Sequence, residues 1–230
     1  MIGSILFNLV FWPTFLVYLA IMNPIIRFCN QKQSFRIVYK VVTKWLLFCL
    51  RVFVGITYEI RGIEKLKKQI EKGEVIIGCN HQSTWETFIF SIIFDELAIV
   101  VKKELESVPI VGIFFKKLGC IPVDRDAGIS SIRNLIKYGK IAIEKNQSIL
   151  IFPNGTRSSA EEKISYKSGI FALYKTLNVP VVPCHVNSGE FWPRRSFKKI
   201  KGSIILEFKD AIAPGLSKDE FMKTFEEINN

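Results

Sequence analysis

Residues 75–94 read VIIGCNHQSTWETFIFSIIF and carry the clearest indication of fold in the chain. The first five positions, 75–79, are apolar or small without alternation, which is typical of a strand buried on both faces of a sheet. Asn80 and Ser83 favour a tight turn, and the positions from 84 to 94 form a helical pattern. A buried strand that turns directly into a helix is the first half of a βαβ unit and predicts a parallel sheet.

The same alternation continues along the chain. Five later runs also read as strands: LAIVV (97–101), CIPV (120–123), SILIF (148–152), VPVVPCHV (179–186) and GSIILEFKDAI (202–212). Helical patterns lie near 84–94, 106–118, 128–145 and 168–177. The expected fold class is therefore α/β, with a largely parallel, mixed sheet flanked by helices. A chain of 230 residues suits one such domain with a small appendage, and we expect an N-terminal helical membrane-binding motif over 1–55 and an αβ domain over 56–230.

The composition favours a lipid surface as the partner. Lys and Arg total 32 against 21 for Asp and Glu, a formal net charge of +11, and 49% of the residues are hydrophobic. A strongly basic chain binds polyanions, of which nucleic acid and anionic phospholipid are the common ones. The apolar content favours an anionic phospholipid membrane. Because no nucleic-acid-binding motif is recognisable, we expect no nucleic-acid partner.

Residues 2–22, IGSILFNLVFWPTFLVYLAIM, contain no charged side chain, and ~20 apolar residues are what a helix needs to cross the hydrocarbon layer. We expect a retained membrane anchor. A cleaved signal peptide is the competing interpretation, but a basic start and a clean cleavage site are missing. Pro13 leaves a re-entrant segment as a further alternative. Residues 23–44 include basic but no acidic side chains, so the αβ domain is expected on the cytoplasmic face of the cell (inner) membrane.

A second helical pattern follows this segment. Arg36, Lys40, Lys44 and Arg51 fall within an arc of roughly 80° on a helix, and apolar residues cover the rest of its surface. This arrangement predicts a helix that lies in the head-group layer. The alternative is a second spanning helix, from which Arg51 reaches the membrane surface.

The cysteines lie along the chain without a C-x-x-C pair or a His/Cys cluster of metal-site spacing: Cys29, Cys49, Cys79, Cys120 and Cys184. This distribution favours free thiols in a reducing compartment, and no metal site is expected. Cys79, two residues before His81, is expected to be a buried strand thiol, with a cysteine nucleophile as the weaker alternative.

Polar residues follow five of the expected strands. They are His81 after the first strand, Lys102 and Lys103 after the second, Arg125 after the third, and the segments 153–157 and 187–195 after the fourth and fifth. The carboxyl ends of parallel strands meet at one edge of a sheet, where the ligands of α/β proteins bind. We therefore expect an acid–base residue, several cations and a glycine-containing turn to converge there.

Glu86 has two interpretations. Residues 83–86 spell an S-x-x-E capping box, in which Ser83 caps the helix and Glu86 reaches back to the N–H of the cap. Alternatively, Glu86 bonds one ring nitrogen of His81 while the other nitrogen takes a proton from a substrate hydroxyl. On one helix the two positions would lie about 140° apart, so this pairing requires His81 in the turn before the helix. No G-x-S-x-G elbow supplies a serine nucleophile, and His185, in an apolar run, is expected to be a core residue.

The segment IFPNGTRS (151–158) places a Pro-x-Gly turn directly after a buried strand. Gly155 allows a positive φ and a close backbone approach, so that the amides around Thr156 and Arg157 can face an anion that Arg157 grips. A solvated loop is the alternative. Arg125 likewise has two interpretations, a phosphate grip or a surface ion pair with a neighbouring aspartate.

Four blocks in this order resemble those of the glycerolipid acyltransferase family, specifically its bacterial 1-acylglycerol-3-phosphate acyltransferases. The blocks are NHQSTWE (80–86), VKKELESVPIVG with LGCIPVDR (101–112 and 118–125), FPNGTRS (152–158) and VPVVPCHVNSGEFWPRR (179–195). The resemblance covers roughly 75–195. It implies an αβ acyltransferase domain tethered by an N-terminal helical membrane motif.

The resemblance also implies roles for individual residues. His81 matches the catalytic base and Glu86 the acid of an H-x-x-x-x-D motif. The residues that match the site for the acceptor's phosphate are Arg125 and Arg157, with Lys102 or Lys103 and the turn residues Gly155 and Thr156. Those that match the last block, associated with the acyl end of the site and with packing, are Val179, Pro180 and Pro183. Two positions depart from the pattern: Glu86 adds a methylene to the usual Asp, and Asn154 replaces the usual Glu and removes a charge.

The implied reaction transfers a fatty acyl group from acyl carrier protein (acyl-ACP) or from coenzyme A (acyl-CoA) to the 2-hydroxyl of 1-acyl-sn-glycerol 3-phosphate. The product is phosphatidic acid, an intermediate of phospholipid biosynthesis. No metal or bound cofactor is implied. Two alternatives stay open: another lyso-lipid acceptor, and a catalytically idle lipid-binding protein, which Asn154 and the basic run over 194–201 favour.

Overall fold

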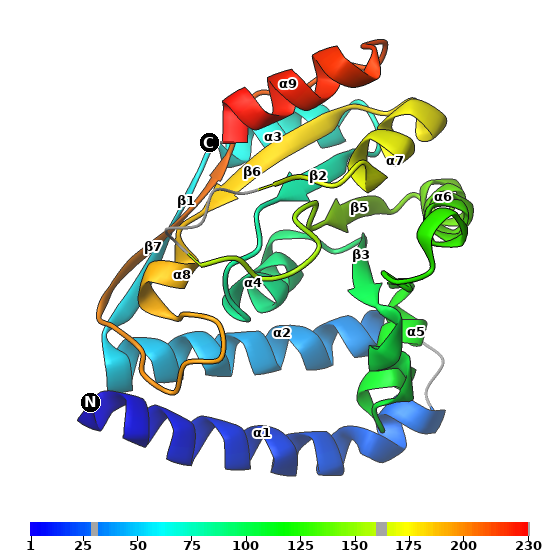
Figure 1. The fold of residues 1–230 in the computed structure, drawn as a ribbon. Coiled ribbons are helices and arrows are strands. Elements are labelled where there is room, and N and C mark those ends of the chain that lie inside the picture. Colours follow the sequence, from blue (N-terminus) through cyan, green and yellow to red (C-terminus); the bar gives the residue numbers. More distant parts are fainter. Residues whose placement is uncertain (29–31, 160–164, 230) are drawn as a thin grey trace.

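The computed structural model describes residues 1–28, 32–159 and 165–229. A seven-stranded sheet with helices on both faces forms the αβ domain, and two long helices lie along one side of it (Figure 1). The strands are β1 (Ile56–Arg61), β2 (Ile76–Cys79), β3 (Leu97–Lys102), β4 (Ile121–Val123), β5 (Ser148–Ile151), β6 (Val181–Val186) and β7 (Gly202–Phe208).

The sheet has the order β1-β7-β6-β2-β5-β3-β4. Five neighbouring strands, from β6 to β4, are parallel to one another. β7 is antiparallel to β6, and β1 is parallel to β7, so these last two strands run the opposite way. The expectation of a largely parallel, mixed sheet is confirmed. The loops after β2, β5 and β6 leave the centre of the sheet at the same edge.

The six strands expected from the sequence all form, and each begins within two residues of its expected start. The expected 202–212 strand is shorter, because β7 ends at Phe208 and only Ile212 pairs again, in a single bridge to Val181. β1 was not expected. Most of its side chains are exposed, so its sequence, ITYEIR, has no apolar run of the kind that marks a buried strand.

The helices of the αβ domain connect these strands. They are α3 (Ile63–Ile70), α4 (Trp85–Ile93), α5 (Val111–Leu118), α6 (Gly128–Glu144), α7 (Gly169–Leu177), α8 (Ser188–Phe191) and α9 (Lys218–Asn229). The helix expected near 106–118 begins only at Val111. Residues Lys103–Ser107 form a 3₁₀ turn instead, and Val108 is extended because the residue before a proline avoids the helical region.

The two faces of the sheet have separate apolar cores. Helices α6, α7 and α9 cover one face, and α4, with α1 and α2 beyond it, covers the other (Figure 1). Gly78, in the central strand β2, allows the first of these layers to approach closely. A Cβ atom there would lie 2.6 Å from Ile170 of α7 and 2.7 Å from Phe225 of α9, so any side chain would force the layers apart.

The N-terminal helices are α1 (Ile2–Phe28) and α2 (Lys32–Cys49), followed by a π-helical turn at Leu50–Val54. α1 remains one helix through Pro13 and Pro24. Its segment Ile2–Pro24 is long and apolar enough to cross a membrane by length and composition, and only 11% of its residues are buried. That exposure is unlike a core helix, although a signal sequence would pass the same test. The expected apolar N-terminal helix is therefore present.

α2 lies against the αβ domain. Its buried residues Val38, Val42 and Leu46 face inward. Of the four cations expected on one lipid-facing arc, Arg36 and Lys40 instead form ion pairs with Glu96 and Asp95, between α4 and β3. Lys44 and Arg51 stay exposed.

This packing corrects one part of the expectation for the second helix, because Arg36 and Lys40 face the αβ domain and not the lipid head groups. A helix bound to the αβ domain along one face does not fit the alternative of a second membrane span. Exposed apolar residues on the outer surfaces of the two helices, Leu9, Leu16, Val41, Trp45 and Phe48 among them, give the motif an apolar outer face.

Candidate active site

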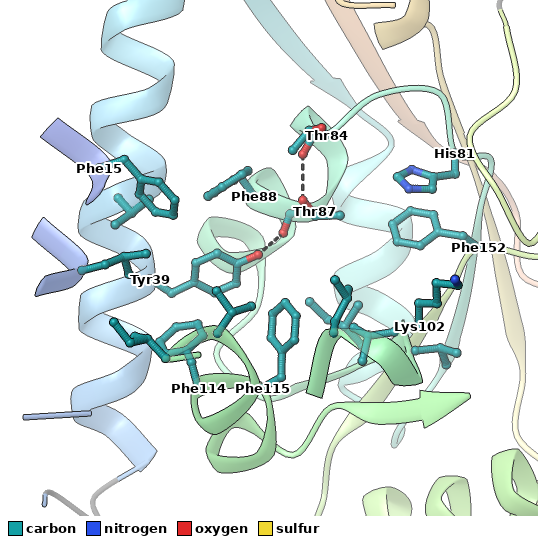
Figure 2. Close-up of a pocket in the computed structure, with 18 of the residues that line it drawn as sticks. Phe15, Tyr39, His81, Thr84, Thr87, Phe88, Lys102, Phe114, Phe115 and Phe152 are labelled. Atoms are coloured by element: carbon teal, nitrogen blue, oxygen red, sulfur yellow. Dashed lines mark hydrogen bonds between the residues drawn. The ribbon is translucent and has the colours of Figure 1, made fainter. Parts of the chain in front are cut away.

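His81 lies in the loop directly after β2, at the edge of the sheet where the expected polar residues were to converge. Its ring stacks on Phe152, which follows β5, with the ring centroids 4.2 Å apart (Figure 2). The side chain is mostly buried, with 14% of its surface exposed, and its Nδ1 atom has no hydrogen-bond partner among the described residues. The Nε2 atom is the ring nitrogen on the side away from Glu86.

The backbone of His81 is held by the turn after β5. The carbonyl oxygen of His81 accepts hydrogen bonds from Ser158 N at 2.9 Å and from Asn154 Nδ2 at 3.0 Å. Asn154 is buried, with 9% of its surface exposed. The amide of Asn154 can donate this bond, whereas the carboxylate of the usual Glu has no proton to give at neutral pH. The departure from the usual Glu thus has a structural role that the sequence did not indicate.

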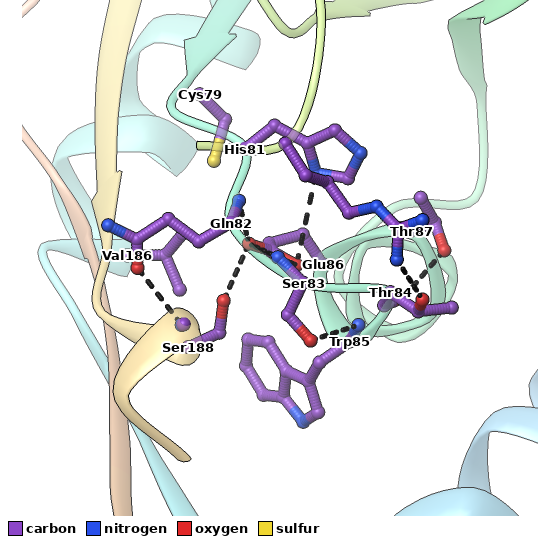
Figure 3. Close-up of polar contacts among 12 residues, drawn as sticks. Cys79, His81, Gln82, Ser83, Thr84, Trp85, Glu86, Thr87, Val186 and Ser188 are labelled. Atoms are coloured by element: carbon purple, nitrogen blue, oxygen red, sulfur yellow. Dashed lines mark hydrogen bonds and ion pairs between the residues drawn. The ribbon is translucent and has the colours of Figure 1, made fainter. Parts of the chain in front are cut away.

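Glu86 is fully buried in the first turn of α4, where it has several hydrogen-bond donors (Figure 3). Its carboxylate accepts from Gln82 N at 2.8 Å, from Ser83 N at 2.9 Å and from the hydroxyl of Ser188 at 2.6 Å. Its nearest approach to His81 is 4.0 Å, from Oε2 to Nδ1, which is too long for a hydrogen bond. Catalytic hydrogen bonds are often long before substrate binds.

One of the two hydrogen bonds of the capping box is present. Glu86 reaches back to Ser83 N as a capping box requires. The hydroxyl of Ser83, however, accepts from Trp85 N and not from the N–H of Glu86. Glu86 therefore both closes the start of α4 and faces His81.

Burial and charge perturb both members of this pair in opposite directions. The pKa of His81 is lowered to about 3, first because burial disfavours the charged ring and then because Arg157, Arg125 and Arg194 repel a proton there. The pKa of Glu86 is raised to about 7 because burial disfavours the carboxylate, and the hydrogen bonds from Ser188, Gln82 and Ser83 only partly oppose this. His81 is thus neutral at neutral pH and available as a proton acceptor.

The structure brings some of the expected cations together and separates others. Arg157 Nη1 donates to Thr84 Oγ1 at 3.0 Å, across from His81, and Arg125 lies on the same cavity. Lys102 also lines the cavity and pairs with Glu104 at 2.8 Å. Lys103 is exposed and lies 3.6 Å from Asp124, in a surface ion pair.

The glycine turn forms as expected at Gly155, which has a φ of 73° and closes back on Phe152 through a 2.9 Å backbone hydrogen bond. Gly155 lines a second, smaller cavity of about 210 Å³ that shares Arg125 and Phe152 with the first. Thr156 is exposed, on the outer side of the turn.

One further arginine lies at the site. Arg194 Nη1 donates to the carbonyl oxygen of Arg157 at 3.0 Å, and its charge reaches His81. The sequence placed Arg194 in a basic run with four other cations, without any feature that set it apart. Its position after the fifth parallel strand was the available signal.

A cavity of about 520 Å³ extends from this cationic end into the apolar interior. Figure 2 shows His81 and Lys102 on one side and Phe15, Tyr39 and Phe114 on the other. The apolar part of the wall comes from four helices and a strand: α1 (Trp12, Phe15, Leu19), α2 (Val38, Tyr39, Val42), α4 (Phe88), α5 (Val111, Phe114, Phe115) and β3 (Ile99, Val100, Val101). The sequence did not indicate that the N-terminal motif supplies part of this wall.

The three residues that match the last block lie away from His81. Val179 and Pro180 precede β6 at the amino edge of the sheet, opposite to His81, and Pro183 is buried within the strand. None of the three lines the large cavity. These three residues contribute packing around β6.

Cys79 is fully buried at the end of β2, and burial raises its pKa well above the usual range. A thiol in that environment is a poor nucleophile. His185 is half-buried in β6, and its Nδ1 lies 3.0 Å from the carbonyl oxygen of Asn229, as expected of a near-core residue. Cys29 falls outside the described residues.

Among the residues that the structure describes, no group of three or more His, Cys, Asp or Glu side chains is placed to hold a metal ion. The expectation that the reaction needs no metal or bound cofactor stays a prediction.

Comparison with known proteins identifies the family. The Acyltransferase family profile matches residues 57–187, which include His81, Glu86 and the glycine turn. The chain belongs to the acyltransferase family. A Pseudomonas aeruginosa protein named 1-acyl-sn-glycerol-3-phosphate acyltransferase is 35% identical over 84% of this acyltransferase and 71% of its own length. The family expected from the four blocks is confirmed.

Other relatives of this acyltransferase carry the same name. One from Haemophilus influenzae is 26% identical over 88% of the chain and 82% of its own length. One from Saccharomyces cerevisiae is 32% identical over 60% of the chain, which spans 46% of that relative.

A solved structure shares the fold. The crystal structure of the 1-acyl-sn-glycerophosphate (LPA) acyltransferase PlsC from Thermotoga maritima aligns with a TM-score of 0.73 at 20% identity, over 97% of this chain and 92% of that one. The N-terminal helices are therefore part of the shared architecture.

Replacing Asn154 with aspartate tests the hydrogen bond that holds His81. Aspartate keeps the size of Asn154 but replaces the donor with a charged acceptor facing the His81 carbonyl. We expect kcat for acyl transfer to fall by about 10²-fold, the effect of a small displacement of a catalytic group, while KM for the acceptor changes little. The control is the same replacement, asparagine by aspartate, at Asn178, an exposed position far from the site. A kcat within twofold of the parent would show that this bond does not position His81.

Proposed function

We propose that this acyltransferase moves a fatty acyl group from a thioester, acyl-ACP or acyl-CoA, to the 2-hydroxyl of 1-acyl-sn-glycerol 3-phosphate and so makes phosphatidic acid. The observation that carries the proposal is one cavity with two unlike ends. At one end a neutral histidine lies among arginines, and at the other the walls are apolar. An acceptor with a phosphate and a donor with an acyl chain require these two environments.

In the proposed step, Nε2 of His81 takes the proton of the 2-hydroxyl as the oxygen attacks the thioester carbonyl. The new C–O bond forms, the C–S bond breaks, and the thiolate leaves with the proton that His81 returns. Glu86 lies on the Nδ1 side and stabilises the positive ring that exists between the two transfers. Atoms and charge balance without a metal or a bound cofactor.

The acceptor's phosphate has an electrostatic effect on the base. The charges of Arg157, Arg125 and Arg194 lower the pKa of His81, and a bound phosphate offsets part of that repulsion. Substrate binding therefore raises the pKa of His81 towards the range in which a general base works best near neutral pH. The arginines consequently select a phosphorylated acceptor and prepare the base for it.

The apolar part of the cavity is the proposed site of the donor's acyl chain. Its volume, about 520 Å³, lies within the range of ligand sites, and its walls are aromatic and aliphatic side chains from both the N-terminal motif and the αβ domain. An acyl chain there would place its carboxyl end beside His81.

Replacing Val38 with phenylalanine tests this assignment. Val38 lines the cavity from α2, the helix whose Tyr39 lies on the side away from His81 (Figure 2). A larger side chain shortens the space for the chain end, so we expect kcat/KM to fall about tenfold or more for long acyl donors and little for short ones. The control is Ile37→Phe, at an exposed neighbouring position outside the cavity. An unchanged preference for chain length in Val38→Phe would move the acyl chain elsewhere.

The apolar outer face of α1 and α2 supports attachment to an anionic phospholipid membrane. We place the αβ domain on the cytoplasmic side of the inner membrane, because the basic residues that follow the apolar segment favour that side.

The direct test is purified full-length protein in vesicles of anionic phospholipid, supplied with labelled lysophosphatidate and with acyl-ACP or acyl-CoA in separate reactions. We expect labelled phosphatidic acid with at least one donor. A panel of other lyso-lipids addresses the second acceptor class, and product from those alone would replace the acceptor proposed here. Vesicle binding without transfer to any acceptor would favour the idle lipid-binding protein.

A further inference from the structure

We propose that Arg194 is a third arginine of the site for the acceptor's phosphate, and that packing of its turn against α1 holds it there. This inference rests on the proposed function and adds a residue of the last block to which the resemblance assigns no role.

The first support is the position of the Arg194 side chain. Its Nη1 atom donates to the carbonyl oxygen of Arg157 at 3.0 Å, which places the exposed Arg194 guanidinium beside the backbone of a residue that lines the cavity. Its charge acts on His81 together with those of Arg157 and Arg125. Arg194 therefore belongs to one cationic cluster and not to a separate basic surface.

The second support is the charge balance of that cluster. Within the part of the chain that the structure describes, neither Arg194 nor Arg157 forms a salt bridge with a carboxylate. The one buried carboxylate nearby, Glu86, accepts hydrogen bonds from three other donors, Gln82 N, Ser83 N and the hydroxyl of Ser188. Arg194 lowers the pKa of Arg157 by more than Glu86 raises it, so repulsion between the two arginines remains, and a doubly charged phosphate relieves this repulsion.

The third support is the turn that presents Arg194. It begins at the buried Trp192 and continues through Pro193 to Arg195, which has a φ of 58°. A left-handed conformation is unfavourable for a residue with a side chain and persists where the surrounding structure imposes it. The strained Arg195 therefore fixes the backbone directly after Arg194, whose exposed side chain reaches the carbonyl oxygen of Arg157.

The surrounding structure that imposes it is the start of α1. The ring of Phe7 meets that of Trp192 edge to face, with centroids 5.6 Å apart. Lys199 Nζ lies 4.6 Å from the centroid of Phe7 and 4.9 Å from that of Trp192, so one ammonium group contacts both rings. The hydroxyl of Ser4 accepts from Lys199 N at 2.9 Å.

These contacts join the membrane-facing helix to the polar end of the site. The same helix supplies Trp12 and Phe15 to the apolar wall of the cavity. α1 thus contacts the proposed acyl site directly and the proposed phosphate site through the turn at Trp192. A displacement of its first two turns would release Arg194 while leaving Arg157 in place.

The test uses full-length protein in anionic phospholipid vesicles. For Arg194→Ala we expect KM for lysophosphatidate to rise about tenfold or more with kcat within threefold, and Arg194→Lys to recover part of the loss. Inorganic phosphate, used as a competitor, should inhibit Arg194→Ala more weakly than the parent. The matched control is Lys198→Ala, an exposed cation of the same loop without a side-chain contact to the site.

The contribution of α1 is tested by Lys199→Met, which keeps the apolar stem and removes the charge above the two rings. We expect KM for lysophosphatidate to rise, as it does in Arg194→Ala. Adding Arg194→Ala to Lys199→Met should raise KM little further, because both changes remove the same contact between Arg194 and the phosphate. A normal KM in Arg194→Ala, or an equal rise in Lys198→Ala, would overturn the assignment of Arg194. A normal KM in Lys199→Met would overturn the role of α1.

A binding measurement separates this inference from the proposed function. The His81→Ala variant is expected to transfer almost no acyl groups, so the affinity for lysophosphatidate can be measured in that background as a dissociation constant. If the parent transfers acyl groups and Arg194→Ala binds normally, only this inference fails. If the parent neither transfers to lysophosphatidate nor binds it, the proposed function fails.

Discussion

His81→Ala is expected to lower kcat for acyl transfer by about 10²- to 10⁴-fold, the range that a positioned acid–base group contributes. The imidazole is the group placed to take the proton of the acceptor hydroxyl, since its ring is neutral and lies at the cationic end of the cavity. KM for lysophosphatidate should change little, because the arginines that hold the phosphate remain. The measurement is initial rate against acceptor concentration in vesicles.

The chain supplies a matched control for this variant. His185, in β6, is the other histidine, and its ring lies against the carbonyl oxygen of Asn229 in α9, away from the cavity. His185→Ala should keep kcat within a fewfold. Circular dichroism of both variants excludes unfolding as the cause. A folded His81→Ala protein with near-normal turnover would end the proposed mechanism.

Glu86→Gln is expected to have the second-largest effect, because an amide cannot stabilise the imidazolium that forms at His81. The glutamine oxygen can still accept from Gln82 N and Ser83 N, so the start of α4 is retained. We expect kcat to fall by about 10²-fold or more. Glu86→Asp restores the usual acid of the motif and should retain more activity than Glu86→Gln.

The pH dependence gives this variant a specific signature. The folded pKa of Glu86 is about 7 and the step requires the ionised form, so kcat/KM of the parent should rise with pH through about 7. Glutamine does not titrate, so this limb should be absent from the residual activity of Glu86→Gln. A pH profile of the same shape in both proteins would assign the titration to another group.

Stability should respond to pH in the opposite direction. The folded pKa of Glu86 lies above its ordinary value of 4.5, so its stabilising contribution is complete below about 4.5 and is lost as the pH rises through about 7. Between pH 5 and pH 8, the Tm of the parent should therefore decrease relative to that of Glu86→Gln. We expect a relative change of at least roughly 2–4 °C, the effect of 1 kcal/mol in a chain of this size.

The central part of the fold could be predicted because its signals are local. VIIGC, the turn at Asn80 and the apolar positions after Thr84 specify a strand, a turn and a helix through contacts within a few residues. The same holds for the glycine turn, whose positive φ at Gly155 is a property of one residue. β1 escaped prediction because an edge strand with exposed side chains has no apolar run.

The site could be predicted only in part. His81, Arg157 and Arg125 follow strand ends, and the parallel order of the strands was enough to bring them to one edge. Lys103 follows a strand as well, yet it pairs with Asp124 on the surface, because position after a strand does not specify the direction of a long side chain. Val179 and Pro180, which the resemblance associates with the acyl end of the site and with packing, lie before their strand and hence at the edge of the sheet opposite His81.

The sequence by itself therefore determined the strand–helix alternation, the parallel sheet, the apolar N-terminal helix and the family. Each of these rests on residue types at short, fixed spacings. The tertiary structure decided what depends on contacts between distant segments: the bond from Asn154 to His81, the hydroxyl of Ser188 on Glu86, the ion pairs that hold α2 to the domain, and the cavity wall shared by α1 and α5. Residues far apart in the chain meet only when the whole core packs, and no local pattern records which of them will touch.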